Sequence, residues 1–449
     1  MKCCEEKKPK GGLLEAQRCI QCYDAPCSKG CPAGIEVDKF IRMINKGDIA
    51  GAALTIEKDN PLGLICGVIC PQESLCQKNC TSHKLGRPIN IKNLQRYALE
   101  NARKEGMDNS ATEREGISIQ RVNFAGNIEL FKVNSSSKGR IAVIGSGPSG
   151  LTCALYLKQM GYQVEIFEQN KMAGGRLTQG IPSFRINNEM LTREIGSITK
   201  TLTIHYNRVF GKDITVSGLK DQGFNAVYLA CGKWQEKALK LPGFDLEGVY
   251  TSSDILMGNK WLIKKHRKAA VIGAGNVAMD VAGTLVAGGL KEVHVFFIGS
   301  NKEVTAWQNE REDAWEKGVI FHMLAIPQNI VGKEGKVEAI NFQRSKVLPG
   351  ENGVWSVKPL EDVLNFTYPV DMVVTSIGFD TNRDILSGQG IQLNASGHAV
   401  TDINLATNIP GIFAGGDLTE SDSFSVVRAV ADGKRAALNI HNMLQKGWC

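Results

Sequence analysis

Long apolar runs are missing from this sequence of 449 residues. No stretch reaches the roughly 18 consecutive apolar residues that a membrane-spanning helix needs. Residues 1–10 carry charges of both signs in place of the apolar core of a signal peptide. Blocks of like charge are also missing, and the formal net charge is only +7, which argues against a nucleic-acid partner. We therefore expect a cytoplasmic protein that binds neither a membrane nor nucleic acid.

Cysteine is scarce over most of the chain and concentrated at its start, because ten of the 13 cysteines lie within the first 80 residues. Clustered cysteines in a reducing cytosol are more often metal ligands than disulfides. The pattern is Cys19-x2-Cys22-x4-Cys27-x3-Cys31-Pro32, then Cys66-x3-Cys70-Pro71 and Cys76-x3-Cys80. Runs closed by Cys-Pro resemble ferredoxin ligand runs, in which the last cysteine often serves the other cluster. The spacing predicts two iron–sulfur clusters, with paired zinc sites as the alternative because zinc also takes four thiolates.

Helical apolar spacing surrounds these cysteines, at residues 37–44, 49–56 and 91–103. A small helical domain is therefore expected around the clusters. From Gly106 to Gly139 the periodicity fades, and Ser135-Ser136-Ser137 is typical of a linker.

A dinucleotide-binding fingerprint follows the linker. Residues 141–144 have the composition of a buried strand, Gly145, Gly147 and Gly150 complete G-x-G-x-x-G, and residues 151–160 are expected to be helical. In such a unit the glycines allow a tight turn, close approach of the backbone to a pyrophosphate, and close helix–strand packing. A second strand at residues 163–167 ends at Glu168, near the position where an acidic residue binds ribose hydroxyls. An ordinary strand–helix turn is the alternative.

A second fingerprint lies about 130 residues further on. A strand at residues 269–272 precedes a G-x-G-x-x-A sequence at 273–278, which opens a helix through Leu285. Alanine at the third glycine position is a permitted variant. The strand that follows, residues 292–298, ends without an acidic residue and without Arg. Two fingerprints predict two dinucleotides bound together, and a duplicated fold with one empty site is the alternative.

Three further stretches suit contacts with a flavin nucleotide. Gly174-Gly175-Arg176 and the Arg185 that follows place cations beside a glycine turn, where Arg can pair with phosphate or ring carbonyls. Near the C-terminus, the sequence from Ile412 to Asp417 precedes a helix expected at 425–444, and an Asp there can accept a bond from a ribityl hydroxyl. A surface Arg and a capping Asp are the alternatives. Strands are also expected at 226–230 and 370–378.

This order of motifs resembles the two-dinucleotide-binding flavoproteins, and with the cysteine runs it resembles the glutamate synthase small-subunit family. It is more similar still to the NADH-oxidising subunits of bacterial dihydropyrimidine dehydrogenases. The specific strings are residues 59–66, Ile89-Asn90-Ile91 with Leu94-Gln95, and residues 180–185. The resemblance implies an α/β fold, with a helical iron–sulfur domain (1–135) followed by two Rossmann-like domains. The nicotinamide domain (263–375) is inserted between the two FAD segments, 136–262 and 376–449.

The resemblance also implies a set of ligands. Cys19, Cys22, Cys27 and Cys80 match the positions that hold one 4Fe-4S cluster, while Cys31, Cys70, Cys76 and Gln95 match those that hold the other; Cys66 would be a packing residue. The positions that match FAD contacts are Gly145, Ser146, Gly147, Pro148, Ser149, Glu168, Arg176, Arg185 and Asp417. Those that match nicotinamide-nucleotide contacts are Gly273, Ala274, Gly275, Asn276, Val277, Ser376, Ile377 and Gly378.

Electron counting completes the expected function. A nicotinamide delivers two electrons as hydride and an iron–sulfur cluster accepts one, so FAD must stand between them. We expect an FAD- and iron–sulfur-dependent NAD(P)H oxidoreductase that feeds electrons to a catalytic partner subunit. The leading partner is an FMN and iron–sulfur subunit that reduces pyrimidines. A glutamate synthase large subunit, a stand-alone diaphorase for ferredoxin, and a non-catalytic nucleotide sensor are the alternatives.

Two further absences narrow the chemistry. Cys153 and Cys231 stand alone, so no redox disulfide is expected beside the flavin, and the seven histidines have no catalytic or metal-like spacing. Relatives that use NADPH often carry Arg after the second strand of the nicotinamide domain, where it can pair with the 2'-phosphate. Here Phe297-Ile298-Gly299 occupy those positions. We therefore expect NADH, with Lys302 and Arg311 as the candidate cations if NADPH is used.

Overall fold

The computed structural model describes residues 11–104, 120–122, 128–130, 138–258, 260–350, 355–363, 365–419 and 425–446. The chain divides into two compact units. Unit 1 comprises residues 1–178, 183–233 and 381–449, and unit 2 comprises 179–182 and 234–380. The linker expected at Ser135–Ser137 lies outside the described residues, and the domain boundaries at 135, 262 and 375 remain predictions.

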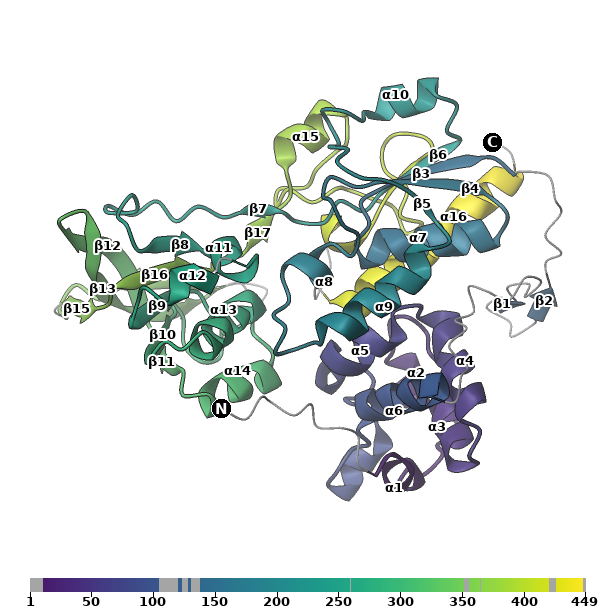
Figure 1. Ribbon diagram of the computed structural model, residues 1–449, viewed down its shortest axis with the longest axis horizontal. Helices are drawn as coiled ribbons and strands as arrows, with labels where there is room; N and C mark the ends of the chain where they lie inside the picture. Colours follow the sequence, from purple (N-terminus) through teal and green to yellow (C-terminus); the bar gives the residue numbers. More distant parts are fainter. Residues whose placement is uncertain are drawn as a thin grey trace. The chain divides into compact units, whose positions relative to one another are not determined.

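Unit 1 begins with a group of short helices (Figure 1). They are α1 (Gly12–Gln17), α2 (Pro26–Lys29), α3 (Val37–Asn45), α4 (Ile49–Asp59), α5 (Gly63–Ile69) and α6 (Ile91–Lys104), with 3-10 turns η1 (Gln72–Ser74) and η2 (Thr81–Leu85). The three helices expected from periodicity are confirmed as α3, α4 and α6. Their apolar faces bury Phe40, Ile56 and Leu94 almost completely, which leaves most of the cysteines in the connecting turns.

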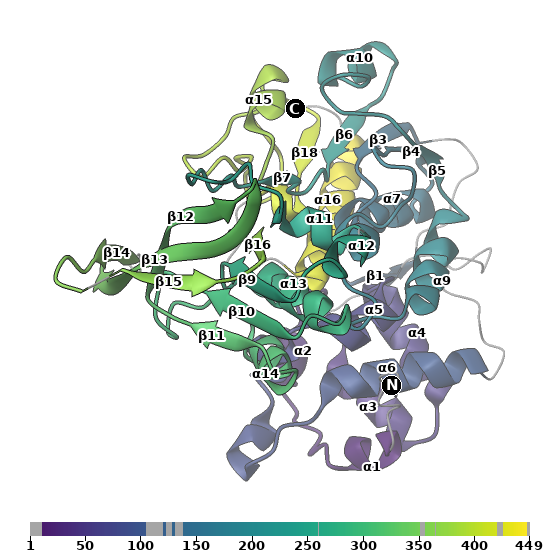
Figure 2. The same cartoon turned by 60° about the vertical axis from the view of Figure 1, so that its left-hand side comes forward.

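The rest of unit 1 is a five-stranded parallel sheet in the order β18-β6-β3-β4-β5. Its strands are β3 (Arg140–Ile144), β4 (Gln163–Phe167), β5 (Thr203–His205), β6 (Ala226–Leu229) and β18 (Ile412–Ala414). The main helices are α7 (Pro148–Gln159), α9 (Asn188–Thr199), α10 (Val216–Asp221), α15 (Arg383–Gly388) and α16 (Val426–Lys446). Helices α7 and α16 run side by side in both views (Figures 1 and 2). A Cβ at Gly433 of α16 would collide with the carbonyl of Ser149 in α7, so this position needs glycine.

Unit 2 is built on a second parallel sheet, in the order β11-β10-β9-β16-β8. Its strands are β8 (Val249–Thr251), β9 (Lys268–Ile272), β10 (Glu292–Phe296), β11 (Ile320–His322) and β16 (Met372–Thr375). The helices are α11 (Ser252–Leu256), α12 (Lys260–Ile263), α13 (Asn276–Ala287) and α14 (Gln308–Glu316). The strand–turn–helix units expected at both fingerprints are confirmed as β3–α7 and β9–α13.

An antiparallel sheet in unit 2 was not expected from the sequence (Figure 2). It contains β12 (Ala325–Lys333), β13 (Lys336–Pro349), β14 (Trp355–Pro359) and β15 (Phe366–Pro369). Phe342 of this sheet stacks on Phe296 of β10, with ring centroids 4.1 Å apart, so it covers one face of the parallel sheet. Two-stranded pairs complete the list: β1 (Gln120–Val122) with β2 (Ile128–Leu130), and β7 (Gln235–Glu236) with β17 (Phe379–Asp380). None of the described helices combines the length and the apolar composition that a bilayer crossing requires.

Candidate functional site

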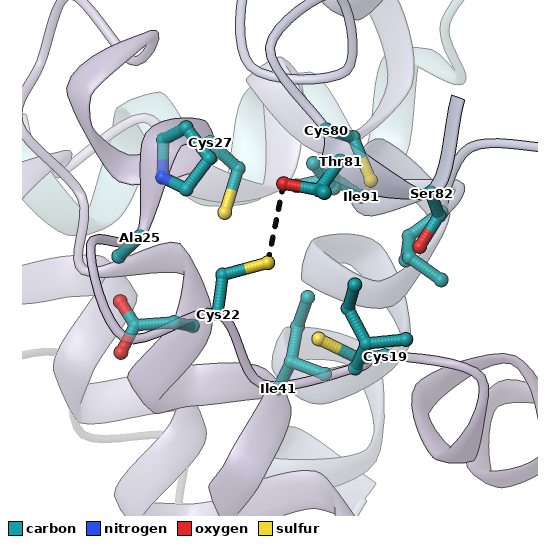
Figure 3. Close-up of a pocket in the computed structure, with 13 residues that line it drawn as sticks. Cys19, Cys22, Ala25, Cys27, Ile41, Cys80, Thr81, Ser82 and Ile91 are labelled. Carbon is teal, nitrogen blue, oxygen red and sulfur yellow. Dashed lines mark hydrogen bonds between the residues drawn. The ribbon is translucent and has the colours of Figure 1, made fainter. Parts of the chain in front are cut away.

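The first group of predicted cluster ligands lines one pocket. Cys19 and Cys22 lie in the segment that connects α1 to α2, Cys27 lies in α2, and Cys80 directly precedes η2. Figure 3 shows the four sulfur atoms around this pocket, with the Cys22 thiol donating to the Thr81 hydroxyl at 3.2 Å. Burial, together with the charges of the neighbouring thiols Cys19 and Cys80, raises the pKa of the Cys27 thiol to about 11. Four such groups can ionise together only when a cationic centre compensates their charges.

The second group is more deeply buried. Burial raises the pKa of Cys31, Cys70 and Cys76, and the latter two are also raised by the charge of Cys31, so the three thiols lie close together. The Gln95 side chain is buried, and its Nε2 donates to the Gly63 carbonyl at 2.6 Å, which fixes the orientation of the amide. Its Oε1 is the atom that could act as a ligand.

Cys66 lies at the edge of this second group. It is buried in α5, and burial raises its pKa to about 12. The charge of Cys66 also raises the pKa of Cys70, so proximity alone does not distinguish it from the predicted ligands. Its place within a helix, packed among apolar side chains, agrees with a packing role.

The donor chemistry of both groups fits iron–sulfur clusters, whose irons are held by thiolates. Within the described part of the chain, no group of three or more His, Cys, Asp or Glu side chains is arranged to hold a single metal ion. The first four thiols line one pocket, and the assignment of the seven thiols and Gln95 to two clusters remains a prediction.

The first fingerprint forms a cradle between β3 and α7. Gly145 has a φ of +100°, and a Cβ there would press against the Ala230 carbonyl, while a Cβ at Gly150 would strike the carbonyl of Gly145. No atom lies within 4 Å of a Cβ built on Gly147, so packing within the protein does not require glycine at that position. The space beside Gly147 fits a group that approaches the backbone closely, as a pyrophosphate does at a helix N-terminus.

Other predicted FAD contacts lie next to this fingerprint. Pro148 occupies the first turn of α7, and the Ser149 hydroxyl is hydrogen-bonded to the Tyr228 hydroxyl at 2.6 Å. A Cβ on Gly175 would lie 3.0 Å from the Cα of Gly147, so the predicted glycine turn at Gly174-Gly175 passes close to the fingerprint.

Glu168 is buried at the end of β4 and faces the same loop. Its Oε2 accepts hydrogen bonds from the N–H of Ser146 at 2.8 Å and from the Ser146 hydroxyl at 2.6 Å. Its Oε1 accepts two more from Asn170, at 2.8 and 2.9 Å. These four bonds occupy the roughly four lone-pair sites of a carboxylate and hold Glu168 against the fingerprint loop. A ribose hydroxyl would have to share or replace one of them, and the role of Glu168 as a ribose ligand remains a prediction.

Asp417 and Arg176 belong to one charged group. Burial raises the pKa of the Asp417 carboxyl, while the charges of Lys233 and Arg176 oppose that rise. Arg176 also donates to the Lys233 carbonyl at 3.0 Å. The structure thus brings together the two predicted residues and adds Lys233, which sequence reasoning missed because it stands in no recognisable motif. Arg185 is half-buried in the segment before α9.

Asp432 is a second residue that sequence reasoning missed. It lies on α16, and its Oδ2 accepts a hydrogen bond from the N–H of Gly416 at 3.0 Å, so it holds the glycine turn beside Asp417. A signal existed, because Asp-Gly within an expected helix is unusual and indicates a packing or binding role.

The second fingerprint has the same form in unit 2. Gly273 has a φ of +126°, and a Cβ there would collide with the carbonyl of Ser376. The structure therefore brings the predicted segment Ser376-Ile377-Gly378 against the fingerprint. The Ala274 carbonyl accepts from the N–H of Ala306 at 3.1 Å, and Asn276 accepts from the N–H of Trp307 at 2.9 Å.

The second fingerprint also has open space and an unpaired hydroxyl, both of which a bound nucleotide could fill or pair with. The nearest atom to a Cβ on Gly275 is the Thr305 hydroxyl at 3.5 Å, and Val277 is the second residue of α13. The Ser376 hydroxyl is buried without a hydrogen-bond partner in the structure. Buried polar groups are rarely left unpaired, so an orphaned hydroxyl beside a glycine fingerprint fits a ligand that supplies the missing partner.

The loop after β10 contains the residues that are expected to determine the choice between NADH and NADPH. Ser300 donates to the Glu303 carboxylate through its N–H at 2.9 Å and its hydroxyl at 2.5 Å. Of the two candidate cations, Arg311 donates to Asn301 at 3.0 Å and Lys302 donates to Ser300 only through its backbone, at 3.3 Å. The Glu303 carboxylate lies in this loop, and the charge of Lys302 is among the causes that lower its pKa. The loop therefore carries charges of both signs, and the expectation of NADH remains a prediction.

Comparison with known protein families gives two matches. Residues 2–107 match the family model described as dihydropyrimidine dehydrogenase domain II, 4Fe-4S cluster. Residues 139–433 match the pyridine nucleotide-disulphide oxidoreductase model. The N-terminal match covers both cysteine groups, and the second covers both fingerprints.

Curated relatives match over nearly the whole chain. The NAD-dependent dihydropyrimidine dehydrogenase subunit PreT of Escherichia coli K12 is 32% identical over 96% of this chain and 94% of its own length. The corresponding subunit of Salmonella typhimurium is 30% identical over 98% of this chain and 95% of its length. The NADP(+)-dependent formate dehydrogenase subunit beta of Moorella thermoacetica is 32% identical, and this chain spans 60% of its length.

Solved structures agree on the fold. Thioredoxin reductase of Lactococcus lactis aligns with a TM-score of 0.53 at 20% identity, over 69% of this chain and 100% of that protein. FprA of Mycobacterium tuberculosis in complex with NADPH aligns with a TM-score of 0.55 at 18% identity, over 69% of this chain and 86% of that protein. The chain therefore belongs to the pyridine nucleotide-disulphide oxidoreductase family, as a member that carries an N-terminal 4Fe-4S domain and combines iron–sulfur clusters with FAD to oxidise NAD(P)H.

Proposed function

We propose that this chain is the electron-input subunit of a dehydrogenase of the dihydropyrimidine dehydrogenase type. It takes electrons from NADH and passes them singly to a catalytic partner subunit. The proposal rests on a direct contact, within unit 1, between the flavin-binding part and the cysteine-rich helical part. Glu194 of α9, in the flavin-binding part, accepts the N–H groups of Leu64 and Ile65 at 2.8 and 2.7 Å, at the start of the helix that leads to Cys70.

In this proposal, the two glycine fingerprints bind the two nucleotides and the two cysteine groups bind the two clusters. Cys19, Cys22, Cys27 and Cys80 would hold one cluster, and Cys31, Cys70, Cys76 and Gln95 the other. Bound FAD would convert the two electrons of a nicotinamide into the single electrons that iron–sulfur clusters accept. The protein supplies geometry, because hydride transfer between two cofactors needs no protein acid or base.

The chain's own groups have defined tasks in this scheme. The open backbone at Gly147 and the N-terminus of α7 bind a pyrophosphate, and Glu168 binds a ribose. The charged group of Asp417, Arg176 and Lys233 orients the flavin through hydrogen bonds and charge. In unit 2, Ser376 donates to or accepts from the nicotinamide nucleotide beside Gly273.

Thiol chemistry is not favoured as the exit for electrons, although the family name includes disulphide oxidoreductases. Among the described residues of the flavin-binding part, the cysteines are Cys153 and Cys231, and neither forms a disulfide. Burial raises the pKa of Cys153 and raises that of Cys231 to about 12. Neither thiol would ionise readily, and reactive cysteines need the thiolate.

Purification of the native complex tests the proposal. We expect a co-purifying FMN and iron–sulfur subunit that reduces uracil with NADH. The resemblance to the formate dehydrogenase subunit of Moorella thermoacetica makes a formate-oxidising partner the second candidate, which NADP+-linked formate oxidation by the complex would identify. A large amidotransferase partner would indicate glutamate synthase. Isolation of an active chain without any partner would contradict the role of an input subunit and indicate a stand-alone diaphorase.

A further inference from the structure

One helix of the flavin-binding part contacts the two cofactor-binding segments of unit 1 through residues only two positions apart. Asp432 of α16 holds the N–H of Gly416 in the glycine turn. Lys434, on the same helix, donates from Nζ to the carbonyl of Ala33 at 3.2 Å and forms an ion pair with Asp59. Ala33 follows Cys31 by two residues, so α16 connects the turn beside Asp417 to the turn that carries a predicted cluster ligand.

The contact at Lys434 is shielded from solvent. The side chains of Lys434 and Asp59 are 24% and 11% exposed. Ion pairs in such places interact more strongly than surface pairs, because water screens them less. The charge of Asp59 also reaches Cys31, whose pKa it raises.

A neighbouring helix supports the same contact independently. The buried hydroxyl of Tyr156, on α7, donates to the carbonyl of Lys58 at 2.5 Å. The Lys434 Nζ lies 6.0 Å from the centre of the Tyr156 ring. The end of α4 is therefore held from both α7, which begins at the first fingerprint, and α16.

We propose that Lys434 is a positioning residue for electron transfer: it fixes the Cys31–Ala33 turn against the flavin-binding helices and places a positive charge beside the cluster held by Cys31, Cys70 and Cys76. This inference rests on the proposed function and on its ligand assignment. The reduction potential of a cluster depends on nearby charge and hydrogen bonding. A cation at Lys434 stabilises the added electron, and the carboxylate of Asp59 opposes that effect.

Opposite charge changes separate this role from a structural one. In the holoenzyme, Lys434→Met removes the cation and Asp59→Asn removes the anion of the same pair. Both variants break the ion pair, so a merely structural role would move the potential of the cluster in the same direction in both. The proposal predicts opposite directions, with the cluster harder to reduce in Lys434→Met and easier to reduce in Asp59→Asn.

The experiment is an anaerobic redox titration followed by electron paramagnetic resonance of the clusters. At a fixed potential, we expect the ratio of reduced to oxidised cluster to fall about tenfold in Lys434→Met, as expected for one partly screened charge. Lys434→Arg should restore the wild-type ratio to within about twofold, since it keeps the charge and a donor. Lys58→Met is the matched control, because it removes an exposed cation one residue from Asp59, and it should leave the ratio unchanged.

Two results would overturn the inference. One is an unchanged ratio in Lys434→Met, and the other is a shift in the same direction in Lys434→Met and Asp59→Asn. Both leave the proposed function intact, because the wild-type protein would still show two reducible clusters. A wild-type protein without cluster signals would overturn the proposed function itself, and the inference with it.

Discussion

Glu168 and Ser146 are joined by two hydrogen bonds to a single carboxylate oxygen, one from the Ser146 N–H at 2.8 Å and one from its hydroxyl at 2.6 Å. Ser146 lies between the first two glycines of the fingerprint, and Glu168 ends the next strand. The acidic residue that the sequence predicts as a ribose ligand is therefore also a structural part of the fingerprint loop. A change at Glu168 should affect both roles together.

The first prediction concerns this pair. Glu168→Ala removes an acceptor for the Ser146 N–H and for a ribose hydroxyl, and hydrogen bonds to a charged group contribute about 1.5–3 kcal/mol each. We expect FAD to bind at least about tenfold more weakly, measured by titration of the apoprotein with flavin fluorescence as the signal. Glu189→Ala, at an exposed position of α9, is the control. An unchanged dissociation constant in Glu168→Ala would show that this carboxylate does not serve the flavin site.

Local patterns made much of the framework predictable. Strand β4 has the bounds expected for it, and α3, α4, α6, α7 and α13 agree with the expected helices to within a few residues. Both fingerprints combine a short β-branched strand with glycines of fixed spacing, a signal that depends on only about ten neighbouring residues. The β12–β15 sheet was missed although β12 and β13 pair as a local hairpin across Glu334-Gly335, where both φ values are positive. Glu-Gly is not one of the Asn-Gly or Asp-Gly pairs that indicate such a turn in a sequence.

Contacts between distant segments were beyond the reach of the sequence. Glu194 is an ordinary acidic residue in a helical pattern, yet the fold buries it against Leu64, 130 residues away. Lys434 and Tyr228 are similar cases, since their partners come from other segments of unit 1. Gln95 was identified only by resemblance. It lies on the buried face of α6 with Leu94 and Leu99, and one amide in an apolar stripe does not by itself indicate a cluster ligand.

The second prediction concerns Glu194. Glu194→Leu has a similar volume but accepts no hydrogen bond, so it leaves the N–H groups of Leu64 and Ile65 without their partner. Each buried unpaired donor costs about 1–3 kcal/mol, and we expect a loss of about 3 kcal/mol in the stability of unit 1. Differential scanning fluorimetry of the holoprotein measures it, with Glu189→Leu on the same helix as the control. A change of less than about 1 kcal/mol would mean that water or another group replaces the carboxylate.

The third prediction is a pH dependence in unit 2. His322 and His294 are hydrogen-bonded at 3.0 Å, and burial lowers the pKa of His322 to about 4. Because this value lies below the ordinary value of about 6.5, the unfolded state binds the proton more readily. The stabilisation is complete above about pH 6.5 and is lost as the pH falls toward 4. Since the ring is only half-buried, we expect a loss of about 1–2 kcal/mol.

Hydrogen exchange of peptides from β10 and β13 measures this effect. Wild type and His322→Gln are compared at the same pH, at 5 and at 7.5, so that the intrinsic exchange rate cancels. We expect protection of the wild type to fall relative to the variant at the lower pH. His83→Gln, at an exposed position of η2, should behave as wild type. Equal protection of wild type and His322→Gln at both pH values would show that protonation of His322 does not destabilise unit 2.

The fourth prediction concerns the choice of nicotinamide. Glu303 accepts the N–H and hydroxyl of Ser300 just after β10, where a 2'-phosphate would be repelled. We expect kcat/KM for NADH to exceed that for NADPH, and Glu303→Gln to reduce this preference about two- to fivefold, as expected for one exposed charge. Steady-state reduction of an artificial acceptor measures both values, with Glu316→Gln as the exposed control. A preference for NADPH in the wild type would reverse the expectation and direct attention to Lys302 and Arg311.

The central claim is that one polypeptide connects a nicotinamide to iron through a flavin. The most direct measurement is anaerobic addition of NADH to the purified holoprotein, with absorbance and electron paramagnetic resonance recorded together. We predict bound FAD and roughly eight iron atoms per chain, as two 4Fe-4S clusters require, with bleaching of the flavin band and the appearance of reduced-cluster signals within seconds. A protein that contains zinc in place of iron, or whose flavin stays oxidised when NADH is added, would contradict the account.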